Sequence, residues 1–199
     1  MKKNKLILIF ASLLFFSSYS STTELDNEAL IFDKIEFKEP VLEAISKYPE
    51  LKGVSIHFVS KEKSKISHQA IPVNKTLFKK KENRRYKIII ANDQEGELDS
   101  TLFKHLDYKS KVGVMGHELA HISDYHDESS FKIMLKGIKY VLSKKFRIEY
   151  ERETNFDAIK HGLKEEILSW SKETHDYLKR DGRGEYYHSP EEIQKLKIE

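Results

Sequence analysis

Two histidines and a glutamate within five residues are the part of the sequence best suited to chemistry. The stretch HELAH places His117 and His121 four residues apart, with Glu118 directly after the first histidine. On an α-helix, residues four apart share a face, so both imidazoles reach one Zn²⁺ ion. Glu118 lies roughly 60° beyond His121, where a carboxylate reaches a water molecule on the metal rather than the metal itself. The stretch therefore predicts one bound zinc ion, with Glu118 as the general base.

The third protein ligand must be a histidine or a carboxylate, because the chain contains no cysteine. In residues 149–162, Glu153 and Asp157 lie four apart on one helical face. This spacing predicts Glu153 as the third ligand. It also predicts Asp157 as an outer carboxylate that accepts the N–H of a ligating histidine. Asp124, on the histidine face of the motif helix, is a second outer carboxylate.

Other interpretations of the third ligand stay open. Glu149 stands four residues before Glu153 and has the same spacing. His126 and Asp127 lie near the position where the metzincin pattern has its third ligand, but that pattern needs a glycine at the place of Asp124. The acidic residues of 149–153 also alternate with arginines, as charges on a solvated helix surface do.

HELAH together with a downstream E-x-x-x-D resembles the gluzincin zinc peptidases, the class of thermolysin. The resemblance covers about 45 residues and implies a zincin-like fold, with His117, His121 and Glu153 as ligands and Glu118 as base. It implies hydrolysis of a peptide or protein substrate through a zinc-activated water. Thermolysin-type enzymes are far longer, so the nearest description is a compact secreted gluzincin.

A peptidase of this kind usually has a further group that stabilises the oxyanion. We expect His188 or Tyr187 in this role, because both lie in a C-terminal loop that can fold over a cleft; His175 and Tyr186 are alternatives. The resemblance also implies that the strand at 86–93 lies beside the motif helix and pairs with an extended substrate at a sheet edge. Its alternative is a buried central strand, because three isoleucines follow one another there.

The order of elements predicts an α+β fold, with a small N-terminal β-sheet, an active-site helix and C-terminal helices. Residues 54–60 and 86–93 show strand patterns, and 98–106 resembles a short helix. A short helix is also expected at 40–48. The expected longer helices are 110–125, 130–146 and 147–178, with a break near Gly162 in the last.

The first twenty residues predict a secretory signal peptide, since a basic start precedes an apolar run and small residues. We therefore expect a secreted or periplasmic protein with a single domain over 21–199 and no stable membrane span; an uncleaved anchor is the alternative. The net charge of +3 comes entirely from three lysines in this segment, which leaves 21–199 neutral. A neutral domain argues against nucleic-acid binding.

The leading hypothesis is thus a zinc metallopeptidase. The main alternative is a non-hydrolytic zinc-binding domain that uses the same scaffold for binding or regulation. Glu118 favours the enzyme, because a structural zinc site has four protein ligands and no need of this carboxylate. A secreted toxin or effector with one specific target is a third interpretation, which no residue pattern selects.

Overall fold

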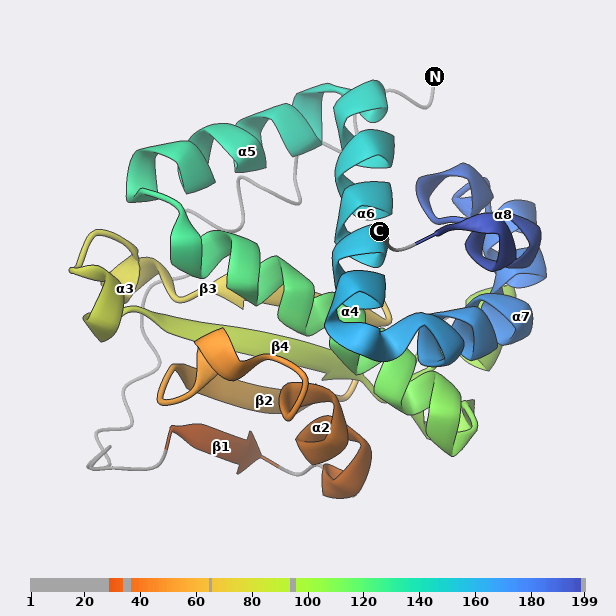
Figure 1. Ribbon diagram of the computed structural model, residues 1–199, viewed down its shortest axis with the longest axis horizontal. Helices are drawn as coiled ribbons and strands as arrows, with labels where there is room; N and C mark the ends of the chain where they lie inside the picture. Colours follow the sequence, from red (N-terminus) through yellow and green to blue (C-terminus); the bar gives the residue numbers. More distant parts are fainter. Residues whose placement is uncertain (1–28, 34–36, 65, 94–95, 198–199) are drawn as a thin grey trace.

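The computed structural model describes residues 29–33, 37–64, 66–93 and 96–197 (Figure 1). The expected signal peptide, residues 1–20, lies outside them. The strands and helices are β1 (Leu30–Asp33), α2 (Lys38–Ile45), β2 (Ser55–Lys61), β3 (His68–Pro72), α3 (Asn74–Leu77), β4 (Arg85–Ala91), α4 (Tyr108–Asp127), α5 (Ser130–Leu142), α6 (Lys144–Ala158), α7 (Lys164–Arg180) and α8 (Pro190–Lys195). The expected α+β class, with a sheet followed by helices, is confirmed.

The sheet has the strand order β1-β2-β4-β3. β1, β2 and β4 run parallel, and β3 pairs antiparallel with β4 at one edge. The strand expected at 86–93 is therefore central, not an edge strand, because both of its sides are paired. The true edge strand beside the motif helix is β3, in a stretch whose mixed composition gave no clear strand signal.

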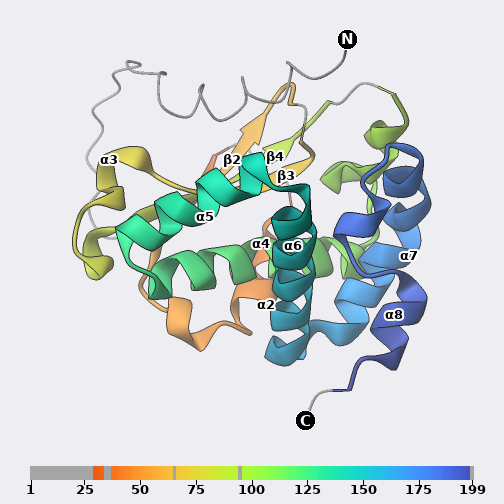
Figure 2. The same ribbon diagram turned by 90° about the horizontal axis from the view of Figure 1, so that it is seen from above.

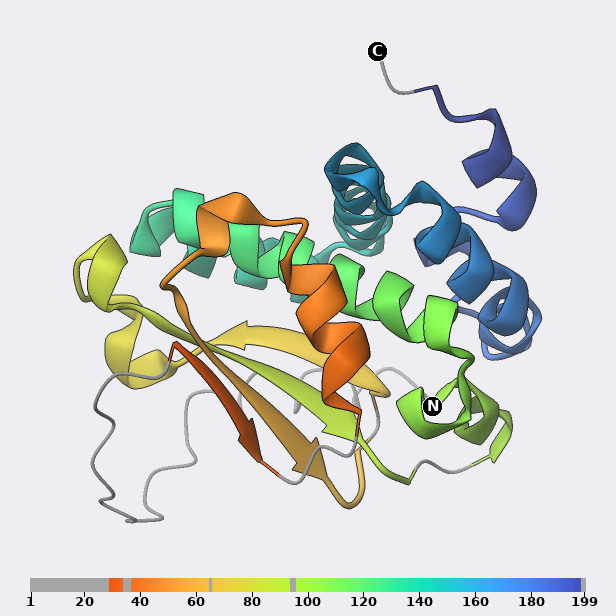
Figure 3. The ribbon, with the colours of Figure 1, turned by 60° about the horizontal axis from the view of Figure 1, so that its bottom comes forward.

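The helices cover one face of this sheet, and α4 lies across the middle of it (Figure 3). Asp107 caps the start of α4 by accepting a hydrogen bond from the Ser110 N–H at 2.6 Å. Every residue from Ser110 to Ser123 is buried. The core side chains of α4, among them Met115 and Leu119, meet those of the sheet, including Phe58 and Ile88.

Two glycines let α4 approach α7 closely. A Cβ atom on Gly113 would lie 2.2 Å from the carbonyl oxygen of Glu166, and one on Gly116 would lie 2.3 Å from Leu163 Cδ1. The Glu166 carbonyl belongs to the backbone, so a larger residue at position 113 would push the helices apart, whereas the end of the Leu163 side chain could shift to make room at position 116. Gly113 thus fixes the depth at which the motif helix sits against α7.

The C-terminal helices end where local chemistry stops them. Ser143 has extended backbone angles and caps α6 by accepting a hydrogen bond from the Phe146 N–H at 3.2 Å. The helix that was expected to reach residue 146 therefore ends at Leu142. Gly162 adopts φ +85°, and the break expected there between α6 and α7 is confirmed. The segment expected as one helix at 98–106 forms two short 3₁₀ helices, Gly96–Thr101 and Phe103–His105. Within the described ranges, no helix has the length and apolar composition to cross a membrane.

Candidate metal centre

Helices α4 and α6 cross so that three potential metal ligands meet in the protein interior (Figure 1). His117 and His121 come from α4, and Glu151 comes from α6. Glu151 Oε2 lies 3.0 Å from His117 Nε2 and 3.5 Å from His121 Nε2. The three residues are exposed by 7% or less. This buried His-His-Glu group could hold a metal ion.

The glutamate in this group is not the expected one. Glu153 is exposed, and Glu149 is exposed too and pairs with Lys145 at 3.8 Å. The buried face of α6 consists of residues spaced three and four apart, and Glu151 belongs to it: Tyr150, Glu151, Thr154, Asn155 and Ala158. Glu153 is two positions away, about 200° around the helix, and so points away from α4. The third ligand is therefore corrected from Glu153 to Glu151.

The second nitrogen of each histidine ring has an oxygen partner from α6. His117 Nδ1 lies 2.7 Å from Asn155 Oδ1, and His121 Nδ1 lies 3.3 Å from Thr154 Oγ1. Asn155 Oδ1 only accepts, so Nδ1 of His117 carries the proton. The Thr154 hydroxyl donates to the Tyr150 carbonyl at 2.8 Å, so it accepts from His121. Both Nε2 atoms are thereby left to face the carboxylate.

This arrangement fits a divalent cation. In neutral histidines with Nδ1 protonated, the two Nε2 lone pairs point at the same carboxylate oxygen, and lone pairs and a carboxylate repel one another. A cation between them removes the repulsion, as does a proton on each ring. Two imidazoles and one carboxylate, each held by an outer hydrogen-bond partner, are the donors of a three-ligand metal site.

The hydrogen bonds around Glu151 keep its carboxylate charged. Burial alone would raise its pKa, but His117 and His121 rings that also carry a proton on Nε2 donate to the carboxylate and hold that pKa well below its usual range. Its other oxygen accepts a 2.5 Å hydrogen bond from the Tyr140 hydroxyl of α5. Glu151 is therefore an anionic ligand fixed from both sides.

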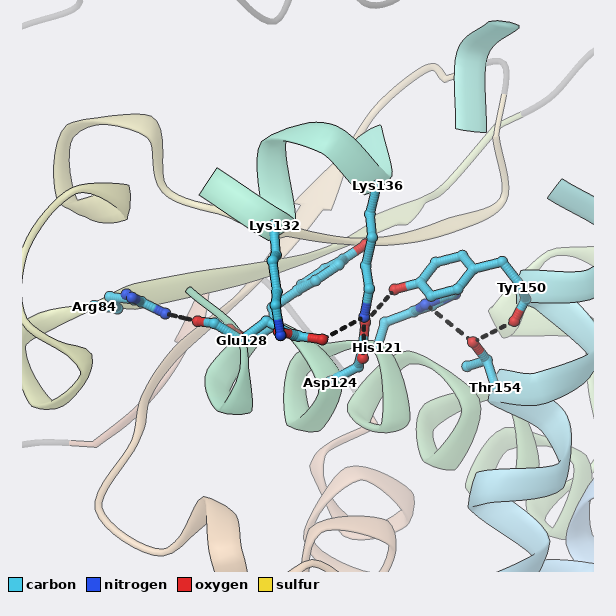
Figure 4. Close-up of polar contacts among 9 residues, drawn as sticks. Arg84, His121, Asp124, Glu128, Lys132, Lys136, Tyr150 and Thr154 are labelled. Atoms are coloured by element: carbon cyan, nitrogen blue, oxygen red, sulfur yellow. Dashed lines mark hydrogen bonds and ion pairs between the residues drawn. The ribbon is translucent and has the colours of Figure 1, made fainter. Parts of the chain in front are cut away.

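The two expected outer carboxylates lie elsewhere. Asp157 contacts Lys160 at 2.8 Å and His161 at 3.9 Å, and neither is in the metal group. Asp124 accepts from Lys136 at 2.5 Å and from the Tyr150 hydroxyl at 2.8 Å (Figure 4). Asn155 and Thr154, rather than these two aspartates, hold the histidine rings. Asp124 reaches His121 only indirectly, through Tyr150 and Thr154.

Glu118 lies beside the metal group with one oxygen unpaired. The main-chain N–H of Ala70 in β3 donates to its carboxylate. Its Oε2 is buried and has no hydrogen-bond partner among the described residues. Burial, and to a lesser degree the nearby Glu151, raises the pKa of Glu118 to about 7. Such a carboxylate can both accept and release a proton near neutral pH.

A cavity of about 40 Å³ adjoins Glu118, which is enough room for a water molecule. Its lining brings together the edge strand, α7 and the C-terminal loop: Ile66, Ser67, His68, Thr101, Glu118, Trp170, Thr174, Leu178, Arg183 and Tyr187. Burial lowers the pKa of His68 to about 3, so this ring is neutral at physiological pH. The cavity is therefore lined by one carboxylate, Glu118, and one guanidinium, Arg183, among uncharged side chains.

Of the two expected oxyanion stabilisers, only Tyr187 lies at the site. Its ring centroid is 5.6 Å from that of His117 and 5.3 Å from that of Trp170. Burial raises the pKa of the Tyr187 hydroxyl well above its usual value, so it remains a donor. His188 does not line the cavity; its carbonyl accepts from the Ser171 hydroxyl at 3.0 Å.

The remaining alternatives also lie away from the metal group. Tyr186 accepts a hydrogen bond from Arg147 at 3.2 Å. His126 contacts the Tyr86 hydroxyl at 3.3 Å, and Asp127 pairs with Lys81 at 2.6 Å. The metzincin-like positions therefore supply no ligand here.

Comparison with known proteins yields no matching family and no similar curated protein or solved structure.

Proposed function

We propose that the protein is a zinc-dependent peptidase with a zincin-like fold. The observation that carries this proposal is the unpaired, buried oxygen of Glu118, a residue that lines a water-sized cavity beside the His-His-Glu group. Two histidines and one carboxylate suit zinc, and three protein ligands leave a fourth position for chemistry. A purely structural ion would give Glu118 no role.

His117, His121 and Glu151 would hold the zinc ion, which would supply a Lewis acid for water and for the scissile carbonyl. Glu118 accepts the proton of the attacking water and passes it to the leaving amine, a transfer suited to a carboxylate with a pKa near 7. Asn155 and Thr154 hold the histidine rings so that both Nε2 atoms face Glu151 and would be free to bind the ion. Tyr187 donates a hydrogen bond to the developing oxyanion.

The edge strand β3 is the proposed binding edge for an extended peptide. Ser67 O accepts from Ala91 N–H and Val73 N–H donates to Arg85 O, so the odd-numbered residues of this stretch bond to β4. The main-chain groups of His68 and Ala70 therefore point to the opposite edge. Ala70 N–H already donates to Glu118, so a peptide beside the base would pair with the Ala70 carbonyl and the His68 main chain instead.

Glu118→Gln is the decisive test of the enzymatic role. The variant should bind one zinc ion per chain as the wild type does, because Glu118 is not in the metal group, and should lose at least about 100-fold in peptide hydrolysis. Metal content by mass spectrometry and cleavage of an unstructured protein such as casein give the two readouts. Unchanged hydrolysis would remove the peptidase proposal; an inactive wild type with full zinc would favour the binding-domain alternative.

Tyr187→Phe tests the oxyanion role. Removing one hydroxyl keeps the ring against His117 and Trp170, so stability and zinc content should not change. We expect kcat to fall about 100-fold with little change in KM, since the hydrogen bond forms chiefly in the transition state. Tyr186→Phe is the matched control, because that hydroxyl contacts Arg147 instead. Equal activity of the two variants would contradict the role.

A further inference from the structure

The outward face of α5 is apolar although it faces solvent. Five large hydrophobic side chains of this helix are between 38% and 76% exposed: Phe131, Met134, Leu135, Ile138 and Leu142. At 100° per residue they fall within an arc of about 100°. Ile133 and Tyr140, the residues that α5 turns toward the protein body, lie on the opposite side. The apolar stripe therefore does not contribute to the core.

A second exposed aromatic side chain extends this surface. Phe78, which directly follows α3, is 75% exposed. The Ser130 hydroxyl donates to the Leu77 carbonyl at 2.6 Å, which ties the start of α5 to this turn. Figure 2 shows α3 beside the same end of α5. We call the five exposed α5 side chains together with Phe78 the α5 surface.

The α5 surface has a basic border. Residues 130–145 contain five lysines and no acidic residue, and residues 74–81 contain four lysines and no acidic residue. Asp124 and Glu128 neutralise Lys136 from the side of α4 (Figure 4). Four further lysines of these two stretches also form ion pairs: Lys81, Lys132, Lys144 and Lys145. Within the described part of the chain, four exposed lysines of the border form no ion pair: Lys75, Lys79, Lys80 and Lys139.

We propose that the α5 surface docks onto an anionic lipid surface. An amphipathic helix with large apolar side chains on one face and lysines at its border lies in the plane of a membrane interface. Lysines near such a surface gain free energy from anionic lipid headgroups. A second copy of the chain is a poorer occupant, because its own α5 surface would bring the same positive charge. This proposal is independent of the peptidase proposal.

The absence of cysteine makes a local test practical with the full chain. Leu142→Cys, labelled with an environment-sensitive dye, reports on the α5 surface. Leu42→Cys, on α2, is the matched control with a 47% exposed leucine. With vesicles of phosphatidylcholine and phosphatidylglycerol, the dye at 142 should brighten and shift to the blue, and lipid-borne spin labels should quench it. The dye at 42 should do neither, even if another segment binds the vesicle.

Substitutions at the border and in the stripe complete the test. Lys139→Gln should weaken binding to the anionic vesicles about fivefold, and Ile138→Glu should abolish the dye response at position 142. Lys47→Gln, an exposed lysine after α2, should leave binding unchanged. Circular dichroism verifies that the helices remain. The proposal is overturned by a dye response equal at 142 and 42, by none with anionic vesicles, or by a concentration-dependent response without lipid, which would show self-association.

Discussion

Helices α4 and α6 supply the two halves of the candidate metal centre, and they do so in different ways. α4 contributes His117, Glu118 and His121 from a single stretch that is buried on all sides. α6 contributes Glu151 from one buried stripe of a helix that is otherwise charged and partly exposed. The positions within α4 are fixed by helix geometry alone. The position of Glu151 is fixed by how two helices pack.

This difference between α4 and α6 shows what sets the relative positions of the three potential ligands. Spacing within one helix sets the angle between His117 and His121 regardless of the surroundings. The approach of Glu151 depends on the rotation of α6 about its own axis. Three side-chain contacts hold that rotation: Tyr140 to Glu151, Asn155 to His117 and Thr154 to His121. Substitutions on α6 therefore test the arrangement more sharply than substitutions on α4.

The largest expected effect is that of Glu151→Gln compared with Glu153→Gln. Glu151→Gln removes the only negative charge of the metal group and should weaken zinc binding by at least about 100-fold, more than the loss of an outer partner usually does. Glu153→Gln changes an exposed side chain and should bind zinc as the wild type does. Competition with a chromophoric chelator measures both affinities. Equal affinities, or a larger loss at Glu153, would mean that α6 is rotated differently.

The next largest effect concerns the packing of α4 on α7. Gly113→Ala places a Cβ against the Glu166 carbonyl, which cannot rotate away, so the free energy of unfolding should fall by about 2–3 kcal/mol. Helix propensity alone would instead raise the free energy of unfolding by about 1 kcal/mol. Gly137→Ala in the half-buried part of α5 is the control for propensity. Urea unfolding of both variants separates the packing effect from the propensity effect. A stabilised Gly113→Ala protein would show that the helices lie farther apart.

The same contrast explains how far the sequence could predict the molecule. HELAH identifies two potential ligands and the proposed base because the relation between these three residues is set within one helix. The choice between Glu149, Glu151 and Glu153 is not local, since all three lie on one short helix and only its packing selects the inner one. A usable signal was present: Tyr150, Thr154 and Ala158 form an uncharged line with a four-residue period, and Glu151 and Asn155 lie directly beside it.

The sheet shows a similar limit. β4 has three consecutive isoleucines, which favour a buried strand, and its central position agrees with that interpretation. β3 was missed because its five residues, HQAIP, combine a proline with two polar side chains. Proline is tolerated on an edge strand, where no partner requires its N–H. The composition that hid β3 is therefore the composition of an edge strand.

The smallest of the three effects concerns the partner of His117. Asn155→Ala removes the acceptor that keeps the proton on Nδ1, so the ring can adopt the tautomer that cannot bind metal through Nε2. Zinc affinity should fall about 10- to 100-fold. Asn155→Asp keeps an acceptor at the same place and should restore most of the loss. Asp157→Ala should change nothing, because Asp157 contacts Lys160 and His161 instead. If Asp157→Ala weakened binding and Asn155→Ala did not, the rotation of α6 would be the one that Glu153 requires.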